Sequence, residues 1–268
     1  WGYCRGCASS LDEAWFSFDA ARREAADVED ADLAARLRLR AQVEMAIVAL
    51  AKGQPLDDVA SLVDEAVRLS AGVEDPYALM RLGHDLGNLG QAEHQAGRWK
   101  AARAHYEQAL ATGLRVPPPA LLAADAETRS LLVWAEARAI AGRAAMEIAR
   151  TLATLGDVEG MREWFDRGLA AMEGPAHPRL LLSRGVLSLE RARAESGDDV
   201  LAPARRISWL REAVRAGLAR GDADGRALAC RAGLELAEQL RGVGDCAAAA
   251  EQARRVEEHR AGLPPAGA

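Results

Sequence analysis

The stretch that decides the fold is Leu86–Leu110, which reads LGNLGQAEHQAGRWKAARAHYEQAL. Apolar residues recur at helical spacing on both sides of Gly97, a pattern typical of two amphipathic helices. Glycine readily adopts the left-handed conformation that ends a helix, so Gly97 predicts a turn between the two. The small residues Gly90, Ala102 and Ala109 predict positions where the backbones of these helices approach closely.

These residues carry a resemblance to a known family. Leu89-Gly90 in the first helix, followed by Ala102, Tyr106 and Ala109 in the second, resembles the tetratricopeptide repeat. The resemblance implies stacked helix-turn-helix units, in which small residues allow close approach and large ones fill the space between neighbouring hairpins.

Weaker copies of the unit surround four other glycines, each between Ala/Leu-rich runs, which gives about five hairpins in all. The glycines are Gly53, Gly156, Gly197 and Gly244. Their spacing is longer and less regular than the family's repeat of about 34 residues. The largest excess follows Pro117-Pro118-Pro119, after which Asp125–Leu155 predicts one long or two short helices.

The predicted fold class is therefore all-α, as a right-handed superhelical solenoid of antiparallel helix pairs. Residues 11–262 form the predicted repeat domain, residues 1–10 an N-terminal segment, and residues 263–268 a disordered tail. Leu11–Ala26 predicts a helix with Trp15, Phe16 and Phe18 exposed, because the helix that would pair with it is missing. Together with Trp1 in place of Met, this suggests a fragment of a longer protein.

The composition of the chain excludes several classes of protein. Half of the 268 residues are hydrophobic but only 4% are aromatic, which favours packed helices over β-sandwiches. The net charge of −6 comes from interleaved charges of both signs, so nucleic acid is not an expected partner. Without a long apolar run or a secretory signal, we expect no membrane association and a cytoplasmic location.

We searched the sequence for catalytic and metal-binding motifs. It contains no glycine-rich phosphate loop, and its five histidines lack the spacing of a helix-borne metal site. Cys4-x-x-Cys7 is half of a zinc or redox motif, and the alternative is a frayed terminus or the remnant of a truncated module. Cys230 and Cys246 are expected in the core. We predict no enzyme activity, no cofactor and no metal.

The candidate partner-binding residues follow from placing the repeat register on the inner face of the predicted solenoid. Basic or potentially basic side chains occupy the groove-facing position of each first helix, and polar donors extend the row. This predicts a groove for an acidic segment or a C-terminal carboxylate, with Arg143, Arg150, Arg184 and Arg191 at its centre. The full set is Arg40, His84, Asn88, Gln91, Arg143, Arg150, Arg184, Arg191 and Arg231.

Two other interpretations compete with this site. An arginine-rich chain places arginines on every solvated helix face, where the neighbouring glutamates Glu44, Glu147, Glu235 and Glu238 neutralise them. At the level of function, the leading hypothesis is a scaffold that binds a protein or peptide. The alternative is the ligand- or peptide-sensing arm of a larger bacterial signalling ATPase or transcription regulator, whose effector domain lies upstream.

Overall fold

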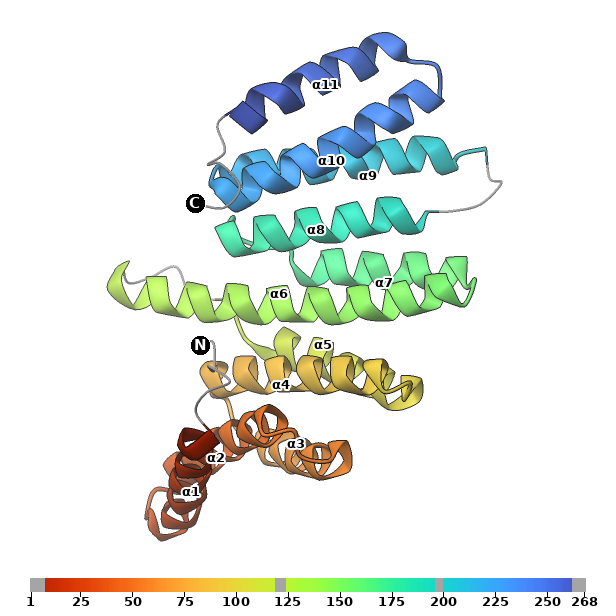
Figure 1. The fold of residues 1–268 in the computed structure, drawn as a ribbon. Coiled ribbons are helices and arrows are strands. Elements are labelled where there is room, and N and C mark those ends of the chain that lie inside the picture. The colour runs from red at the N-terminus through yellow and green to blue at the C-terminus, as the bar shows by residue number, and fades with distance from the viewer. Residues whose placement is uncertain (1–7, 119–123, 196–199, 262–268) are drawn as a thin grey trace. The chain divides into compact units, whose positions relative to one another are not determined.

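The computed structural model describes residues 8–118, 124–195 and 200–261. Within them the chain is all-helical and contains no strand (Figure 1). Cys4, Cys7, Gly197 and the tail 263–268 lie outside the described residues. The α-helices are α1 (Ala8–Glu24), α2 (Ala31–Ala51), α3 (Leu56–Ser70), α4 (Pro76–Gln95), α5 (Trp99–Arg115), α6 (Ala124–Thr154), α7 (Val158–Ala171), α8 (Pro178–Ala194), α9 (Ala202–Arg220), α10 (Ala223–Gly242) and α11 (Cys246–Ala261), with a short 3-10 helix η1 (Ala25–Asp27) after α1.

The chain divides into two compact units, residues 1–144 and residues 145–268. The division falls within α6, whose 31 residues form one continuous helix. Of the two forms expected for Asp125–Leu155, the structure therefore has the single long helix.

In the first unit, neighbouring helices pack in pairs: α1 with α2, α2 with α3, and α4 with α5. Aspartates start two of these helices. Asp30 accepts hydrogen bonds from the N–H groups of Asp32 and Leu33 at the start of α2, and Asp75 caps α4 in the same way. The predicted turns at Gly53 and Gly97 are confirmed, with φ values of 70° and 76°.

The close crossing predicted between the two helices of the deciding stretch is also present. Ala102 and Ala109 are buried, and a Cβ on Gly90 would lie 2.9 Å from two ring carbons of Tyr106. Such a distance is too short for a real Cβ contact, so only glycine fits at position 90 without a shift of its neighbours. The small residues therefore set the separation of α4 and α5.

The N-terminal aromatic residues lie on α1, which packs against α2. Phe16 is 67% exposed, whereas Trp15 and Phe18 are half-buried. The Nζ atom of Lys52 lies 5.9 Å from the centre of the Trp15 ring, a cation–π contact that covers part of that ring. The predicted exposed patch is thus reduced to Phe16.

In the second unit, helices α8 to α11 follow one another in chain order, each packed on the next (Figure 1). Their core contains Leu189, Leu210, Leu228 and Leu236, one or two residues from each of α8, α9 and α10. Glycines with φ of 79° and 83° make the predicted turns at Gly156 and Gly244.

Two features of the second unit differ from the sequence-based expectations. Gly221 adopts a φ of 77° between α9 and α10, at a turn that we did not predict, and Asp222 then caps α10. Cys230 is buried as expected, but Cys246, the first residue of α11, is exposed. Cys246 is therefore not a core residue.

Candidate functional site

The predicted binding residues lie on the helices that precede the five predicted turn glycines, which we call the first helices: α2, α4, α6, α8 and α10. We describe these residues unit by unit. In the described part of the chain, no helix is both long and apolar enough to cross a membrane. No group of three or more His, Cys, Asp and Glu side chains in these residues is arranged to hold a metal ion.

In the first unit, Arg40 of α2 does not project freely into solvent. Its Nε atom lies 2.6 Å from Oδ2 of Asp75, and its guanidinium lies 5.7 Å from the centre of the Tyr77 ring. Burial opposes the ionisation of Asp75, but hydrogen bonds from Arg40 and the Ala78 N–H outweigh it and lower the Asp75 pKa. Arg40 thus joins α2 to the start of α4.

The remaining predicted residues of the first unit lie on α4 and α6. Nδ2 of Asn88 lies 2.9 Å from Nδ1 of His84 on the same face of α4. Gln91 is exposed one turn further along the helix. On α6, Arg143 is also exposed and lies 3.5 Å from Glu136. His84 and Asn88 are half-buried, Gln91 and Arg143 are exposed, and the described contacts do not gather them into one cavity.

A second ion pair joins two first helices, and sequence reasoning named its glutamate, Glu44, but missed its arginine, Arg81. Arg81 of α4 donates two hydrogen bonds to Glu44 of α2, at 3.2 and 3.1 Å. Asp85 lies one turn along α4 from Arg81; its side chain is 3% exposed, and neither carboxyl oxygen has a hydrogen-bond partner among the described residues. Burial raises the pKa of Asp85 well above its usual value, because the nearby charge of Arg81 only partly offsets the loss of water.

In the second unit a chain of ion pairs crosses three first helices. Arg150 of α6 lies 3.4 Å from Glu147 and 3.7 Å from Glu190 of α8. Glu190 in turn accepts from Arg193 at 2.8 Å, and Arg193 reaches Glu235 of α10 at 2.5 Å. We call this set the ion-pair ladder. It agrees with the interpretation in which glutamates neutralise the arginines of the first helices.

Arg191 lies in a different environment from the other predicted arginines. Its side chain is buried, its guanidinium lies 4.0 Å from the centre of the Trp209 ring of α9, and it pairs with Asp166 of α7. Arg191 therefore fills the space between helices and does not face an open groove. Arg184 is half-buried and Arg231 is exposed.

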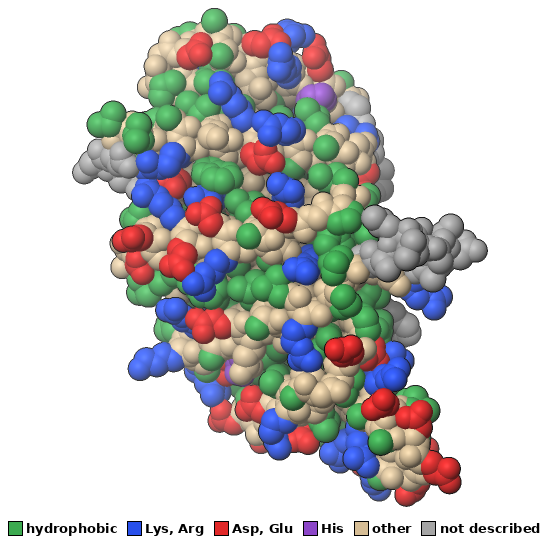
Figure 2. Space-filling model, turned by 180° about the vertical axis from the view of Figure 1, so that it is seen from behind, with side chains coloured by type: hydrophobic (Ala, Val, Ile, Leu, Met, Phe, Trp, Pro, Cys, Tyr) green, Lys and Arg blue, Asp and Glu red, His purple; other side chains and the backbone are tan. Residues whose placement is uncertain are grey.

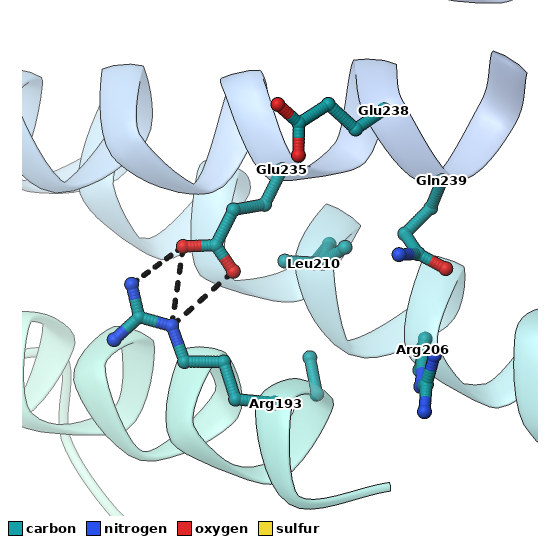
Figure 3. Close-up of a pocket in the computed structure, with 7 residues that line it drawn as sticks. Arg193, Arg206, Leu210, Glu235, Glu238 and Gln239 are labelled. Atoms are coloured by element: carbon teal, nitrogen blue, oxygen red, sulfur yellow. Dashed lines mark hydrogen bonds and ion pairs between the residues drawn. The ribbon is translucent and has the colours of Figure 1, made fainter. Parts of the chain in front are cut away.

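Beside the ladder is a cavity of about 330 Å³ between α8, α9 and α10 (Figure 3). The ladder pair Arg193–Glu235 forms one wall, and the buried side chain of Leu210 lies between the polar ends. Opposite, Gln239 points from α10 toward Arg206 of α9. Ala192 and Glu238 complete the lining.

Hydrogen bonds to Glu195, at the end of α8, position the cavity-lining residue Arg206 and the helices around it. The Nε atom of Arg206 donates to the backbone carbonyl of Glu195, at the end of α8. The fully buried Glu195 carboxylate also accepts from Arg162 at 2.9 and 3.1 Å and from Arg205 at 3.1 Å. Burial opposes its ionisation, but these two arginines lower the Glu195 pKa. This cluster fixes α7, α8 and α9 around the cavity.

The distribution of charge on the surface also agrees with local pairing of arginines and carboxylates. Figure 2 shows basic and acidic side chains interspersed over the face that it draws. Many of the described arginines lie within 4 Å of a carboxylate, as in the ladder. In each unit the arginines are therefore balanced mainly by nearby carboxylates, and these ion pairs are stronger where they are partly buried.

These features define an all-helical protein whose helices pack in neighbouring pairs, an arrangement compatible with a helical-repeat fold. No protein-family model matches the chain, and no curated protein matches it. Among solved structures, the chain is similar to one described as "Crystal structure of BtubC (BKLC) from P. vanneervenii". The likeness has a TM-score of 0.52 and covers 96% of this chain and 95% of that one, at 15% sequence identity. At this identity, the likeness concerns the fold alone.

Proposed function

We propose that this chain is a tetratricopeptide-like scaffold whose stacked helix pairs form a superhelical solenoid, and that it binds a segment of another protein on the face formed by its first helices. The alternative role, as the sensing arm of a larger regulator, uses the same face and differs in what the chain is attached to. We therefore treat binding of a protein segment as the function to test.

One observation carries this proposal: the cavity between α8, α9 and α10 opens beside two consecutive first helices. Helical repeats bind their partners with the first helices of successive units. The volume of about 330 Å³ is at the lower end of the range for ligand pockets, roughly 300–1,000 Å³. It suits one long side chain of a bound segment better than a large cofactor.

The lining of the cavity suits the recognition of a peptide. Leu210 offers a buried apolar surface, while the side chains of Glu238 and Gln239 lie at the cavity and make no hydrogen bond with a described residue. A segment that binds there buries apolar atoms against Leu210 and forms hydrogen bonds with the amide and the carboxylate.

A displayed library of random peptides tests this proposal directly. Peptides selected by the parent protein are measured against Gln239→Trp, which fills the cavity, and against Arg241→Trp, an exposed site on the same helix outside the lining. We expect Gln239→Trp to abolish binding and Arg241→Trp to preserve it, with both variants as helical as the parent. Equal binding by both would place the site elsewhere, and a library that yields no binders would contradict the scaffold function.

A further inference from the structure

We propose that a cavity in the first unit binds a free α-amino acid with an apolar side chain. The cavity lies between the loop that joins α3 to α4 and the end of α5, and we call it the loop cavity. It belongs to a different unit from the cavity beside the ion-pair ladder. Its ligand is a small zwitterion and not a protein segment, so this inference stands apart from the proposed function.

The loop cavity has a volume of about 580 Å³, within the range of roughly 300–1,000 Å³ that ligand pockets occupy. Three segments of the chain meet around it: the loop after α3, the first turn of α4 and the end of α5. All three belong to the first unit, where α3 packs on α4 and α4 packs on α5. The lining includes Val73, Glu74, Pro76, Leu79, Arg115 and Pro117.

Arg115 is the basic group of the loop cavity, and the end of α3 holds it in place. Its Nη1 atom donates to Oγ of Ser70 at 3.0 Å, and its Nη2 atom donates to the carbonyl oxygens of Ser70 and Val73 at 2.5 and 3.5 Å. Carbonyl groups at a helix C-terminus orient a cation but carry only a partial negative charge. Arg115 makes no ion pair with a described residue, and its Nε–H makes no described hydrogen bond. Its charge and this N–H group therefore remain for an anionic group of a ligand.

Glu74 is the acidic group of the loop cavity. It follows Val73 directly in the chain, so it lies next to the residue whose carbonyl oxygen Arg115 contacts. Glu74 is exposed and makes no hydrogen bond or ion pair with a described residue, Arg115 included. A purely anionic ligand would be attracted by Arg115 but repelled by Glu74, and a purely cationic ligand would meet the reverse. A zwitterion pairs its carboxylate with Arg115 and its ammonium group with Glu74.

The rest of the lining that the argument uses is apolar, which selects the side chain of the ligand. Val73 and Leu79 are 5% and 2% exposed, so both belong to the packed core of the unit. Pro76 and Pro117 add apolar rings, and the fixed φ of proline limits the movement of the backbone on both sides of the cavity. An apolar side chain that enters the cavity leaves water and packs against these residues. A polar side chain would lose hydrogen bonds to water without regaining them there.

The test uses matched ligands and matched variants. Isothermal titration calorimetry measures binding of L-leucine, L-methionine and L-phenylalanine to the parent protein. The amide and the N-acetyl derivative of the amino acid that binds best remove its carboxylate and its ammonium charge in turn. The variants are Glu74→Gln, Arg115→Gln and the control Glu29→Gln, an exposed residue between η1 and α2 without a described hydrogen bond or ion pair. Circular dichroism checks that all the proteins are equally folded.

We expect each derivative to bind the parent at least about tenfold more weakly than the free amino acid. Glu74→Gln should bind the amino acid about tenfold more weakly and the N-acetyl derivative as the parent does, so that it no longer distinguishes the two. Arg115→Gln should lose the distinction between the amino acid and its amide, and Glu29→Gln should bind like the parent. If Arg115→Gln is less folded, the comparison of Glu74→Gln with Glu29→Gln decides.

Three results would overturn the inference: no amino acid of the panel binds the parent, the N-acetyl derivative binds as well as the free amino acid, or Glu74→Gln and Glu29→Gln behave alike. None of these results affects the proposed function, which is tested with peptides and with Gln239→Trp in the second unit. Conversely, a protein that binds the amino acid but no peptide would retain this inference and lose the scaffold function.

Discussion

The ring of Tyr106 lies against Gly90 so closely that a Cβ on the glycine would be 2.9 Å from two ring carbons and 3.2 Å from the Ala102 carbonyl oxygen. Tyr106 is buried and has little room to move. Gly90→Ala should therefore destabilise the protein by about 1–3 kcal/mol through overpacking. Gly87 is the matched control on the same helix, because a Cβ there meets nothing within 4 Å.

In the control, Gly87→Ala should stabilise the protein by about 0.5–1 kcal/mol, since alanine is the better helix former. Urea unfolding of the two variants measures both effects. If the variants shift stability in the same direction, α4 and α5 do not cross at Gly90.

The buried Asp85 makes stability depend on pH. Because burial raises its pKa, the folded protein keeps the proton at pH values where the unfolded chain, with a usual pKa of 3.8, has lost it. The contribution of the Asp85 proton to the free energy of unfolding is fully present below pH 3.8. This contribution is lost as the pH rises through the raised pKa that Asp85 has in the folded protein.

We therefore predict that Asp85→Asn, which needs no proton to remain neutral, is more stable than the parent by about 1 kcal/mol or more at neutral pH. The difference between variant and parent should grow as the pH rises from acid conditions. Denaturant unfolding at a series of pH values measures it, and the other titrating groups cancel in the difference. A difference that is constant with pH would show that Asp85 ionises in the folded protein as it does in the unfolded chain.

The turns were predictable because their signal is local. A glycine between two amphipathic runs is sufficient, and Gly53, Gly97, Gly156 and Gly244 all adopt positive φ. Gly221 carries the same signal, followed by the helix-capping Asp222, but it joins one hairpin to the next and lies outside the pattern that we followed. A search for every glycine followed by a capping residue would have found it.

The pairing at the candidate site was less predictable, because it links residues on different helices. Glu44 and Arg81 are 37 positions apart, and Arg193 and Glu235 are 42 positions apart. Both separations are close to one repeat, so opposite charges one repeat apart are a signal that sequence analysis could use. The burial of Arg191 has no such signal, because it depends on the approach of Trp209 from the next helix.

The different roles of two predicted arginines on α8 can be separated by conservative substitution. Arg191→Lys keeps a positive charge for Asp166 but loses the planar contact with Trp209, so we expect a cost of about 1–2 kcal/mol in unfolding free energy. Arg184→Lys should stay within about 0.5 kcal/mol of the parent, since Arg184 is half-buried without a described ion pair. Thermal unfolding compares the two, and equal effects would argue against a packing role for Arg191.

The last prediction concerns how the Arg193–Glu235 pair sets the charge preference of the cavity. Arg193 and Glu235 are 41% and 29% exposed, so breaking the pair costs about 1 kcal/mol or less and leaves the protein folded. In Glu235→Gln, Arg193 loses its bidentate carboxylate and keeps only the Nη1 hydrogen bond to Glu190, so its Nε–H and Nη2–H groups become available to an acidic ligand. We expect acidic peptides to gain about three- to tenfold in affinity and basic peptides to lose affinity. Glu238→Gln is the control: it leaves the Arg193–Glu235 pair intact, so basic peptides should weaken without a gain for acidic ones. Fluorescence anisotropy with one acidic and one basic peptide of equal length measures the ratio of affinities for each protein. If Glu235→Gln and Glu238→Gln change that ratio by the same factor, the pairing of Arg193 does not determine which charge the cavity accepts.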